Sequence, residues 1–184
     1  MKKYLTSLLC LLSLQACLIG SGKNSEIEVK SAELFPTITG IDLLGKQREL
    51  PKTFEGKLNI VAVAFKREQQ ADIDGWIPDF EKITSKNSAV NFYEVPLIYE
   101  LSSFSRAWVN NGMRFGIPNE AARKRTITVY TNRDKFFEIM KMKEDSIYVL
   151  LLDSAGKILW QTEGLATADK LAELQKVILR ETNK

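Results

Sequence analysis

The stretch "LNIVAVAFKREQQADIDGWIPDF", residues 58–80, decides the fold. It opens with a continuous apolar, β-branched run at 58–65, which is typical of a strand buried on both faces of a sheet. A charged loop follows at 66–74, and apolar residues then recur at helical spacing up to Ile83. Pro78 lies inside this pattern, so the helix begins close to it or bends there. Strand, loop and helix in this order predict an α/β protein, in which such a loop commonly carries the chemistry.

Outward from this stretch, strand and helix patterns alternate. A segment that alternates on each side of Gly45-Lys46 predicts a hairpin over 37–50. The other expected elements are a strand at 89–98 ended by Pro96, a helix at 104–113 stopped by Asn111-Gly112, a strand at 125–131, a short helix at 133–141, a hairpin of strands at 146–153 and 157–164, and a helix from Thr167 onward. This order predicts an α/β sandwich with a mixed central sheet, an N-terminal β-hairpin and flanking helices, as one domain over residues 34–184.

The N-terminus has the pattern of an export signal. Two lysines precede an apolar stretch at 5–14, which is shorter than the roughly 20 residues that a bilayer span needs, so residues 1–16 are predicted to be a signal peptide. The sequence "LQAC" at 14–17 resembles the lipobox of bacterial lipoproteins, whose cysteine receives acyl chains such as palmitate. The resemblance implies lipidation of Cys17, a lipidated tether over 17–33, and a membrane-anchored location in the bacterial cell envelope, facing the periplasm or the exterior. The alternative is an ordinary secretory signal with a chance cysteine.

Composition excludes several kinds of site. The first sixteen residues hold two lysines and no acid, which leaves 24 basic and 23 acidic residues, so charge gives no reason to expect a nucleic-acid partner. The chain has no histidine, and its two cysteines are Cys10 in the signal and Cys17. Histidine-based acid/base catalysis, a Ser-His-Asp triad and the His/Cys sites that zinc prefers are therefore ruled out. Carboxylate sites for hard cations stay possible, but no EF-hand spacing occurs, and we expect neither a metal nor a cofactor.

The order of elements and four stretches carry a family resemblance. The order resembles the thioredoxin-like superfamily, and the N-terminal hairpin makes it most similar to the peroxiredoxin type. The more specific stretches are "LNIVAVAFKREQQADIDGWIP", "WVNNGMRFGIP", "TITVYTNRDKF" and "SIYVLLLDSAGKILWQTEG". They resemble the family of the mitochondrial F-type ATP synthase assembly factor known as subunit ten, with its bacterial relatives, over residues 34–180. The resemblance implies a protein partner and a role in assembling or maintaining a membrane complex.

The residues that give thioredoxins their activity are missing from this sequence. In that superfamily the nucleophilic cysteine follows the first buried strand, at a helix N-terminus that lowers the pKa of the thiol. Counting back from Pro78, the two cysteine positions fall on Gln70 and Ile73, and neither side chain can attack a disulfide or a peroxide. The cis-proline of the superfamily is also absent from 141–146. We therefore expect a lipid-anchored domain that acts by protein contacts and not by catalysis.

Two alternatives stay open. One is a thiol-disulfide or peroxide redox protein of the cell envelope, in which the active cysteine has been displaced or Cys17 stays unmodified; Cys17 would then lack activation by a helix N-terminus. The other is an enzyme that uses non-thiol chemistry on a ligand held by basic residues, for which charge is the only support.

The loop after the first buried strand is the main candidate surface. Its charged residues could dock a protein partner at the edge of the sheet where open α/β folds bind ligands; they are Lys66, Arg67, Glu68, Asp72 and Asp74. The alternative is a solvated loop with a helix-capping aspartate. Catalysis by paired carboxylates needs a carboxyl with a raised pKa, and the neighbouring Lys66 and Arg67 act in the opposite direction.

Two further candidates follow in the sequence. An exposed Trp76 would make a good contact for a partner, although the apolar patterns around Trp76, Trp108 and Trp160 indicate core or half-buried positions. Arg114 is the preferred member of a basic group that could bind phosphate or a partner's carboxylates; the others are Arg106, Arg123, Lys124 and Arg125. The alternative for this group is a solvated helix face.

Overall fold

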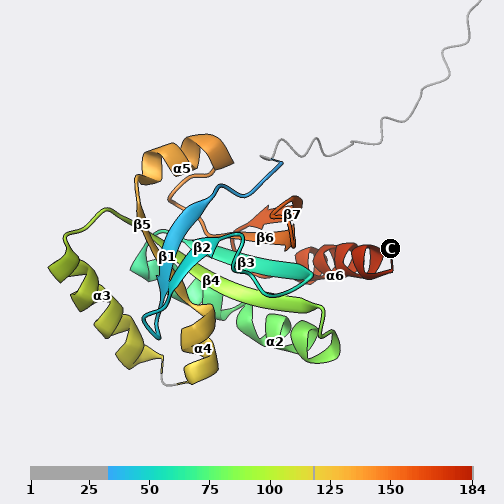
Figure 1. The fold of residues 1–184 in the computed structure, drawn as a ribbon. Helices are drawn as coiled ribbons and strands as arrows, with labels where there is room; N and C mark the ends of the chain where they lie inside the picture. Colours follow the sequence, from blue (N-terminus) through green and yellow to red (C-terminus); the bar gives the residue numbers. More distant parts are fainter. Residues whose placement is uncertain (1–32, 118, 184) are drawn as a thin grey trace, which may run out of the picture.

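A mixed seven-stranded sheet organises the domain (Figure 1). The computed structural model describes residues 33–117 and 119–183. Their elements are β1 (Ile38–Asp42), β2 (Gln47–Leu50), β3 (Leu58–Ala64), η1 (Arg67–Gln69), α1 (Gln70–Asp74), α2 (Ile77–Lys86), β4 (Val90–Tyr99), α3 (Ser103–Gly116), α4 (Glu120–Arg125), β5 (Ile127–Thr131), α5 (Arg133–Met140), β6 (Tyr148–Asp153), β7 (Ile158–Glu163) and α6 (Ala168–Thr182). The strand order is β2-β1-β5-β4-β3-β6-β7. β4 pairs in parallel with β3 and β5, and the other pairs are antiparallel. The predicted α/β class, mixed sheet and N-terminal hairpin are confirmed.

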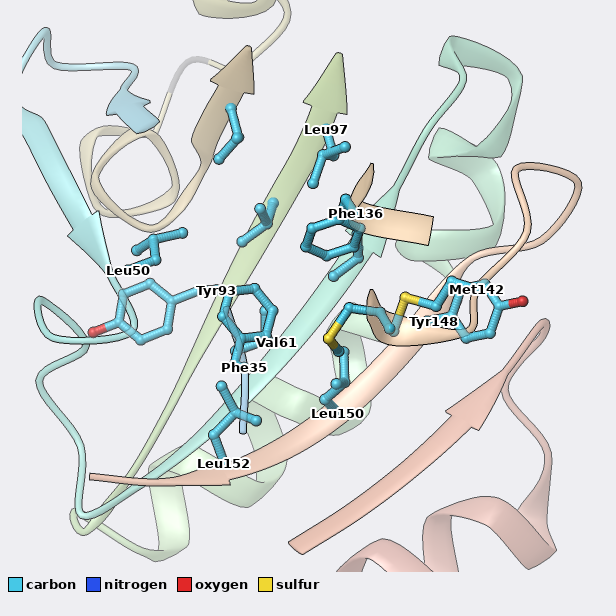
Figure 2. Close-up of a cluster of buried hydrophobic side chains, with 14 of the residues drawn as sticks. Phe35, Leu50, Val61, Tyr93, Leu97, Phe136, Met142, Tyr148, Leu150 and Leu152 are labelled. Atoms are coloured by element: carbon cyan, nitrogen blue, oxygen red, sulfur yellow. The ribbon is translucent and has the colours of Figure 1, made fainter. Parts of the chain in front are cut away.

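β3 is buried on both faces, as its apolar run predicted. Val61 belongs to one core and Ile60 to the other, because successive side chains of a strand point to opposite faces. Figure 2 shows the first core, in which Val61 lies among Leu50, Tyr93, Phe136 and Leu150. The second core joins the sheet to α1, α2 and α6; it includes Ile73, Trp76, Phe80, Val149, Leu174 and Ile178.

The prediction that Pro96 ends the second parallel strand was wrong. β4 continues to Tyr99, because Pro96 lies where its pairing changes partner. The register with β3 ends at Ala64 opposite Pro96, and the register with β5 begins at Leu97 opposite Val129. A proline lacks a backbone N–H, and it is tolerated at a position where the ladder changes neighbour.

Two helix predictions also need correction. The helix expected to stop at Asn111-Gly112 continues to Gly116. Ile117 follows it with an extended backbone, which suits the residue before a proline. α4 was not predicted at all, since its residues form a charged run without an apolar face. α2 begins close to Pro78 as expected, where the missing N–H costs no intrahelical bond. Within residues 33–117 and 119–183, no helix combines the length and apolar character that crossing a bilayer requires.

Candidate functional site

The side chain of Gln69 closes the turn at the C-terminal end of β3. Gln69 is buried at the end of η1, and its Oε1 accepts hydrogen bonds from the backbone N–H groups of Phe65 (2.7 Å) and Lys66 (3.1 Å). Its Nε2 donates to the backbone carbonyl of Glu144 at 2.9 Å, in the loop before β6. The turn is therefore tied both to the strand that it leaves and to a loop distant in sequence. Sequence reasoning missed Gln69, because an amide inside a polar loop gives no signal of burial.

Two cations hold the side chain of Glu144 beside this turn. Arg133 Nη2 lies 2.9 Å from Glu144 Oε2, and Lys66 Nζ lies 3.6 Å from Oε1. Arg133 is buried, and its guanidinium also stacks against aromatic rings. Arg133 Cζ lies 4.3 Å from the ring centroid of Tyr99, 5.3 Å from that of Phe137 and 5.5 Å from that of Phe65. Arg133 follows β5, so this cluster ties the ends of β3, β4 and β5 together at one edge of the sheet. Of its members, the sequence had singled out only Lys66.

The loop predicted at 66–74 is mostly helical, since η1 and α1 together cover residues 67–74, and its other charged residues are exposed or half-buried. Arg67 and Glu68 are exposed, and within the described part of the chain their side chains make no hydrogen bond or ion pair. Asp72 is half-buried, and Asp74 is exposed and accepts a hydrogen bond from Gln70 at 2.9 Å. The geometry makes this loop available for a partner, and its use as a docking surface stays a prediction.

The pattern of this sequence is that of a known family. A family model with the description "ATP10 protein" matches residues 21–180. The chain belongs to the ATP10 protein family. No curated protein sequence matches this ATP10-family chain significantly.

Solved structures share the fold of this ATP10-family chain at low sequence identity. A proposed electron transfer protein from Aquifex aeolicus VF5 has a TM-score of 0.55 and 14% identity, and the match covers 80% of this chain and 95% of that one. Thiol peroxidase from Chromobacterium violaceum has a TM-score of 0.51 and 12% identity, with coverage of 84% and 88%. These likenesses concern the fold alone, which is thioredoxin-like as predicted.

The ATP10-family chain carries no thiol at the thioredoxin positions. Gln70, one of the two positions expected for cysteine, is exposed at the start of α1, and Ile73, the other, is buried in the second core. Both cysteines of the sequence precede Glu33, so none occurs in the described domain. Among the residues that the structure describes, no group of three or more potential metal-ligating side chains comes together either.

Trp76 cannot be a contact for a partner in this ATP10-family chain, so that candidate was wrong. Its side chain is fully buried, stacks on Phe80 with ring centroids 5.6 Å apart, and donates from Nε1 to the carbonyl of Gly164 at 3.1 Å. The exposed tryptophan is instead Trp108, which is 76% exposed although its pattern indicated the core or a half-buried position. A helix's apolar face looks the same in sequence whether or not another element covers it.

The basic group around Arg114 does not converge on one site. Arg114 is half-buried and its Nε donates to the carbonyl of Leu43 at 2.8 Å, which fixes the β1–β2 turn against α3. The other members have separate partners. Arg106 donates to the carbonyl of Leu101 at 2.7 Å, and Arg123 donates to the carbonyl of Ile117 at 2.6 Å. Lys124 forms an ion pair with Glu55 at 3.0 Å, and the guanidinium of Arg125 lies 4.3 Å from the ring centroid of Phe92. These contacts position α3 and α4, and a partner contact at Arg114 stays a prediction.

Glu94 is a buried carboxylate that sequence reasoning missed. It lies on β4, and burial raises its pKa above the ordinary value, while the charge of Arg125 and a hydrogen bond from Gln70 act in the opposite direction. Arg125 Nε is 4.0 Å from Glu94 Oε1. An acid inside an otherwise apolar strand, "VNFYEVPL", was the signal that could have found it. Its partners belong to the same domain, so we interpret it as a structural group.

Proposed function

We propose that this ATP10-family chain is a lipid-anchored thioredoxin-like domain that acts by protein contacts, without thiol catalysis, in the assembly or maintenance of a membrane complex. One observation carries the proposal: the buried amide of Gln69 fills the strand–helix turn that holds the nucleophile in thioredoxins. Residues 65–74 contain no cysteine, so this turn has no thiol that could attack a disulfide or a peroxide.

The proposed contact surface is Arg67 and Glu68, the first two residues of η1. Gln69 binds the backbone N–H groups of Phe65 and Lys66 directly before η1, so the backbone that carries these two exposed residues has a defined position. A backbone that is held in place favours binding, because little loop freedom is lost on contact. The family resemblance supplies the kind of complex, which is an F-type ATP synthase.

The proposed membrane attachment is the acylated Cys17. An intact mass of the mature protein isolated from host membranes should equal the chain from Cys17 onward plus its acyl chains. A mature protein that still contains an unmodified Cys17 would contradict the anchor, although not the contact surface.

A complementation experiment tests the assembly role. In host cells that lack the gene, the amount of assembled F-type ATP synthase in membranes should fall, and the wild-type chain should restore it. The variant Arg67→Glu/Glu68→Lys, which exchanges the two charges and keeps their sum, should restore much less. Undiminished ATP synthase in cells without the gene would refute the assembly role.

A matched control separates the loop from a general effect of charge. Glu173 and Lys176 are also exposed, but they lie on α6. The exchange Glu173→Lys/Lys176→Glu should therefore complement as well as the wild type. Equal complementation by the loop variant would eliminate the contact surface, and turnover of insulin disulfides or hydrogen peroxide above background would eliminate the non-catalytic interpretation.

A further inference from the structure

α3 carries a line of aromatic side chains that no part of the described chain covers. Phe104, Trp108 and Phe115 are 84%, 76% and 90% exposed, and no residue of α3 is buried. Their spacing of four and seven residues places all three on one side of the helix. In Figure 1, α3 lies at the side of the domain with its outer side uncovered. We call these three side chains the α3 face.

Polar contacts on the inner side of α3 fix the direction of this face. Tyr130 of β5 donates to Asn110 Oδ1 at 2.9 Å, and Arg114 Nε donates to the carbonyl of Leu43 at 2.8 Å. The helix is therefore held by its polar side while its most apolar side points outward. Three aromatic side chains on one exposed line are more than the scattered surface apolar residues that a folded domain normally carries.

The helix itself carries no acid. Its two charged side chains, Arg106 and Arg114, are half-buried on the inner side, and the exposed Glu100 and Glu120 flank the helix. The hydrogen bond from Arg114 to Leu43 brings the β1–β2 turn beside the helix, and this turn adds Leu44, which is 46% exposed, and the exposed Lys46. An outward aromatic line with cations beside it is the arrangement by which helices lie in the interface of an anionic bilayer.

We propose that the α3 face lies against a lipid bilayer with anionic headgroups and so orients the domain on the membrane. The inference rests in part on the proposed function, since the chain between Cys17 and Glu33 can span at most about 55 Å and would keep an anchored domain next to the bilayer. A tethered anchor limits only the distance from the bilayer, and a second attachment of this kind would also fix the orientation of the domain.

Trp108 itself reports on this contact. The mature chain, from residue 17 onward and with Cys17→Ser, is mixed with protein-free vesicles of phosphatidylcholine, with or without phosphatidylglycerol, that contain a lipid brominated in its acyl chains. Tryptophan fluorescence should be quenched with phosphatidylglycerol present and much less without it. The added substitution Trp108→Phe keeps the face apolar and should remove most of the quenching, since Trp76 is buried and Trp160 is half-buried on β7.

Paired variants identify the surface while Trp108 stays as the reporter. Phe104→Ser/Phe115→Ser should weaken vesicle binding by roughly tenfold or more, because two exposed aromatic side chains lose their apolar contact. Leu165→Ser/Leu179→Ser changes two side chains that are 60% and 61% exposed elsewhere, and it should bind like the wild type. All four replaced side chains are exposed, and the thermal unfolding of each variant checks that the fold is kept.

Two results would overturn the proposal. One is the absence of Trp108 quenching in both kinds of vesicle, which would leave the α3 face to a protein partner. The other is a dimer in sedimentation without vesicles that Phe104→Ser/Phe115→Ser abolishes, which would assign the face to a second copy of the chain. Because Cys17 is replaced in this experiment, its outcome does not depend on acylation or on the assembly role.

Discussion

Replacing Gln69 by alanine should destabilise the domain far more than the same change at its neighbour Gln70. Gln69→Ala removes two acceptor contacts, to the N–H groups of Phe65 and Lys66, and one donor contact, to the carbonyl of Glu144. The alanine methyl group can replace none of them. The backbone groups that lose their partner remain near the end of β3 and in the loop before β6.

The magnitude follows from how accessible these groups are to water. The hydrogen bond to Phe65 is buried, and an unsatisfied buried N–H costs about 1–3 kcal/mol. The bonds to Lys66 and Glu144 are part-buried, so water can replace the side chain there at about 0.5 kcal/mol each. The free energy of unfolding should fall by roughly 2–4 kcal/mol, which lowers Tm by roughly 5–15 °C in a domain of this size.

Gln70→Ala is the matched control for this measurement. Gln70 is exposed, as is its hydrogen bond to Asp74 Oδ1 at 2.9 Å, and its side chain also reaches Glu94. Loss of the side chain should change the free energy of unfolding by no more than about 1 kcal/mol. Urea unfolding followed by circular dichroism gives both values, and hydrogen exchange should show faster exchange of the Phe65 amide in Gln69→Ala alone.

The reasoning fails if the two alanine variants unfold at the same urea concentration. It also fails if the Phe65 amide keeps its protection in Gln69→Ala, because the side chain would then not be what closes the turn. Either result would show that Gln69 is not what holds this turn, and would remove the argument that it gives Arg67 and Glu68 a defined position.

Three further outcomes are expected. Burial raises the pKa of Glu94, so the folded state binds its proton more tightly than the unfolded state does. Stability should therefore fall as the pH rises from about 4.5 through the raised pKa. Glu94→Gln should remove this fall, although it loses the charge pair with Arg125, and should give a higher Tm than the wild type at neutral pH and a similar Tm at acidic pH. Gly156→Ala should lower stability by more than about 1 kcal/mol in urea unfolding, because φ is +84° there and the added Cβ would meet the ring of Pro51. Gly112→Ala should instead stabilise the interior of α3 by up to about 1 kcal/mol, since no atom lies within 4 Å of an added Cβ, and slower hydrogen exchange in α3 would register it.

Local patterns were sufficient for the strands at the centre of the sheet. The apolar runs of β3 and β6 extend over whole strands, and a strand buried on both faces needs no information beyond its own residues to be recognised. Pro96 was misread because its effect depends on which strand lies beside it, and the change of partner at that residue is a property of the sheet.

The tryptophans show the same limit for helices. Trp76 and Trp108 both lie in helical apolar patterns, yet the first is fully buried and the second is 76% exposed. The difference is whether another layer covers the helix: α6 joins the second core beside Trp76, while none of the described residues covers the outer side of α3. Periodicity identifies the apolar face of a helix, but it does not show whether another element packs against that face.

The candidate site was only half predictable for a similar reason. Exposed charges such as Arg67 and Glu68 can be read from a polar loop, because no neighbour is needed to explain them. The role of Gln69 depends on the carbonyl of Glu144, which is 75 positions away in the sequence. Neither residue suggests this contact by its type or by its local pattern, so only the fold could reveal it.

The topology places the two proposed surfaces on related parts of the domain. β3 and β4 are parallel neighbours, so their carboxyl ends lie at the same edge of the sheet, and η1 follows the first while α3 follows the second. Arg133 packs against Phe65 and Tyr99 at these two ends and fixes them relative to each other.

A domain whose α3 face lies in the bilayer interface would therefore present Arg67 and Glu68 in a constant direction relative to the membrane. A flexible tether alone cannot do this, because it limits the distance from the bilayer and leaves the orientation open. For a partner that is itself embedded in the membrane, a fixed orientation lowers the entropy lost on binding, so the aromatic line on α3 and the charged pair on η1 would support the same interaction.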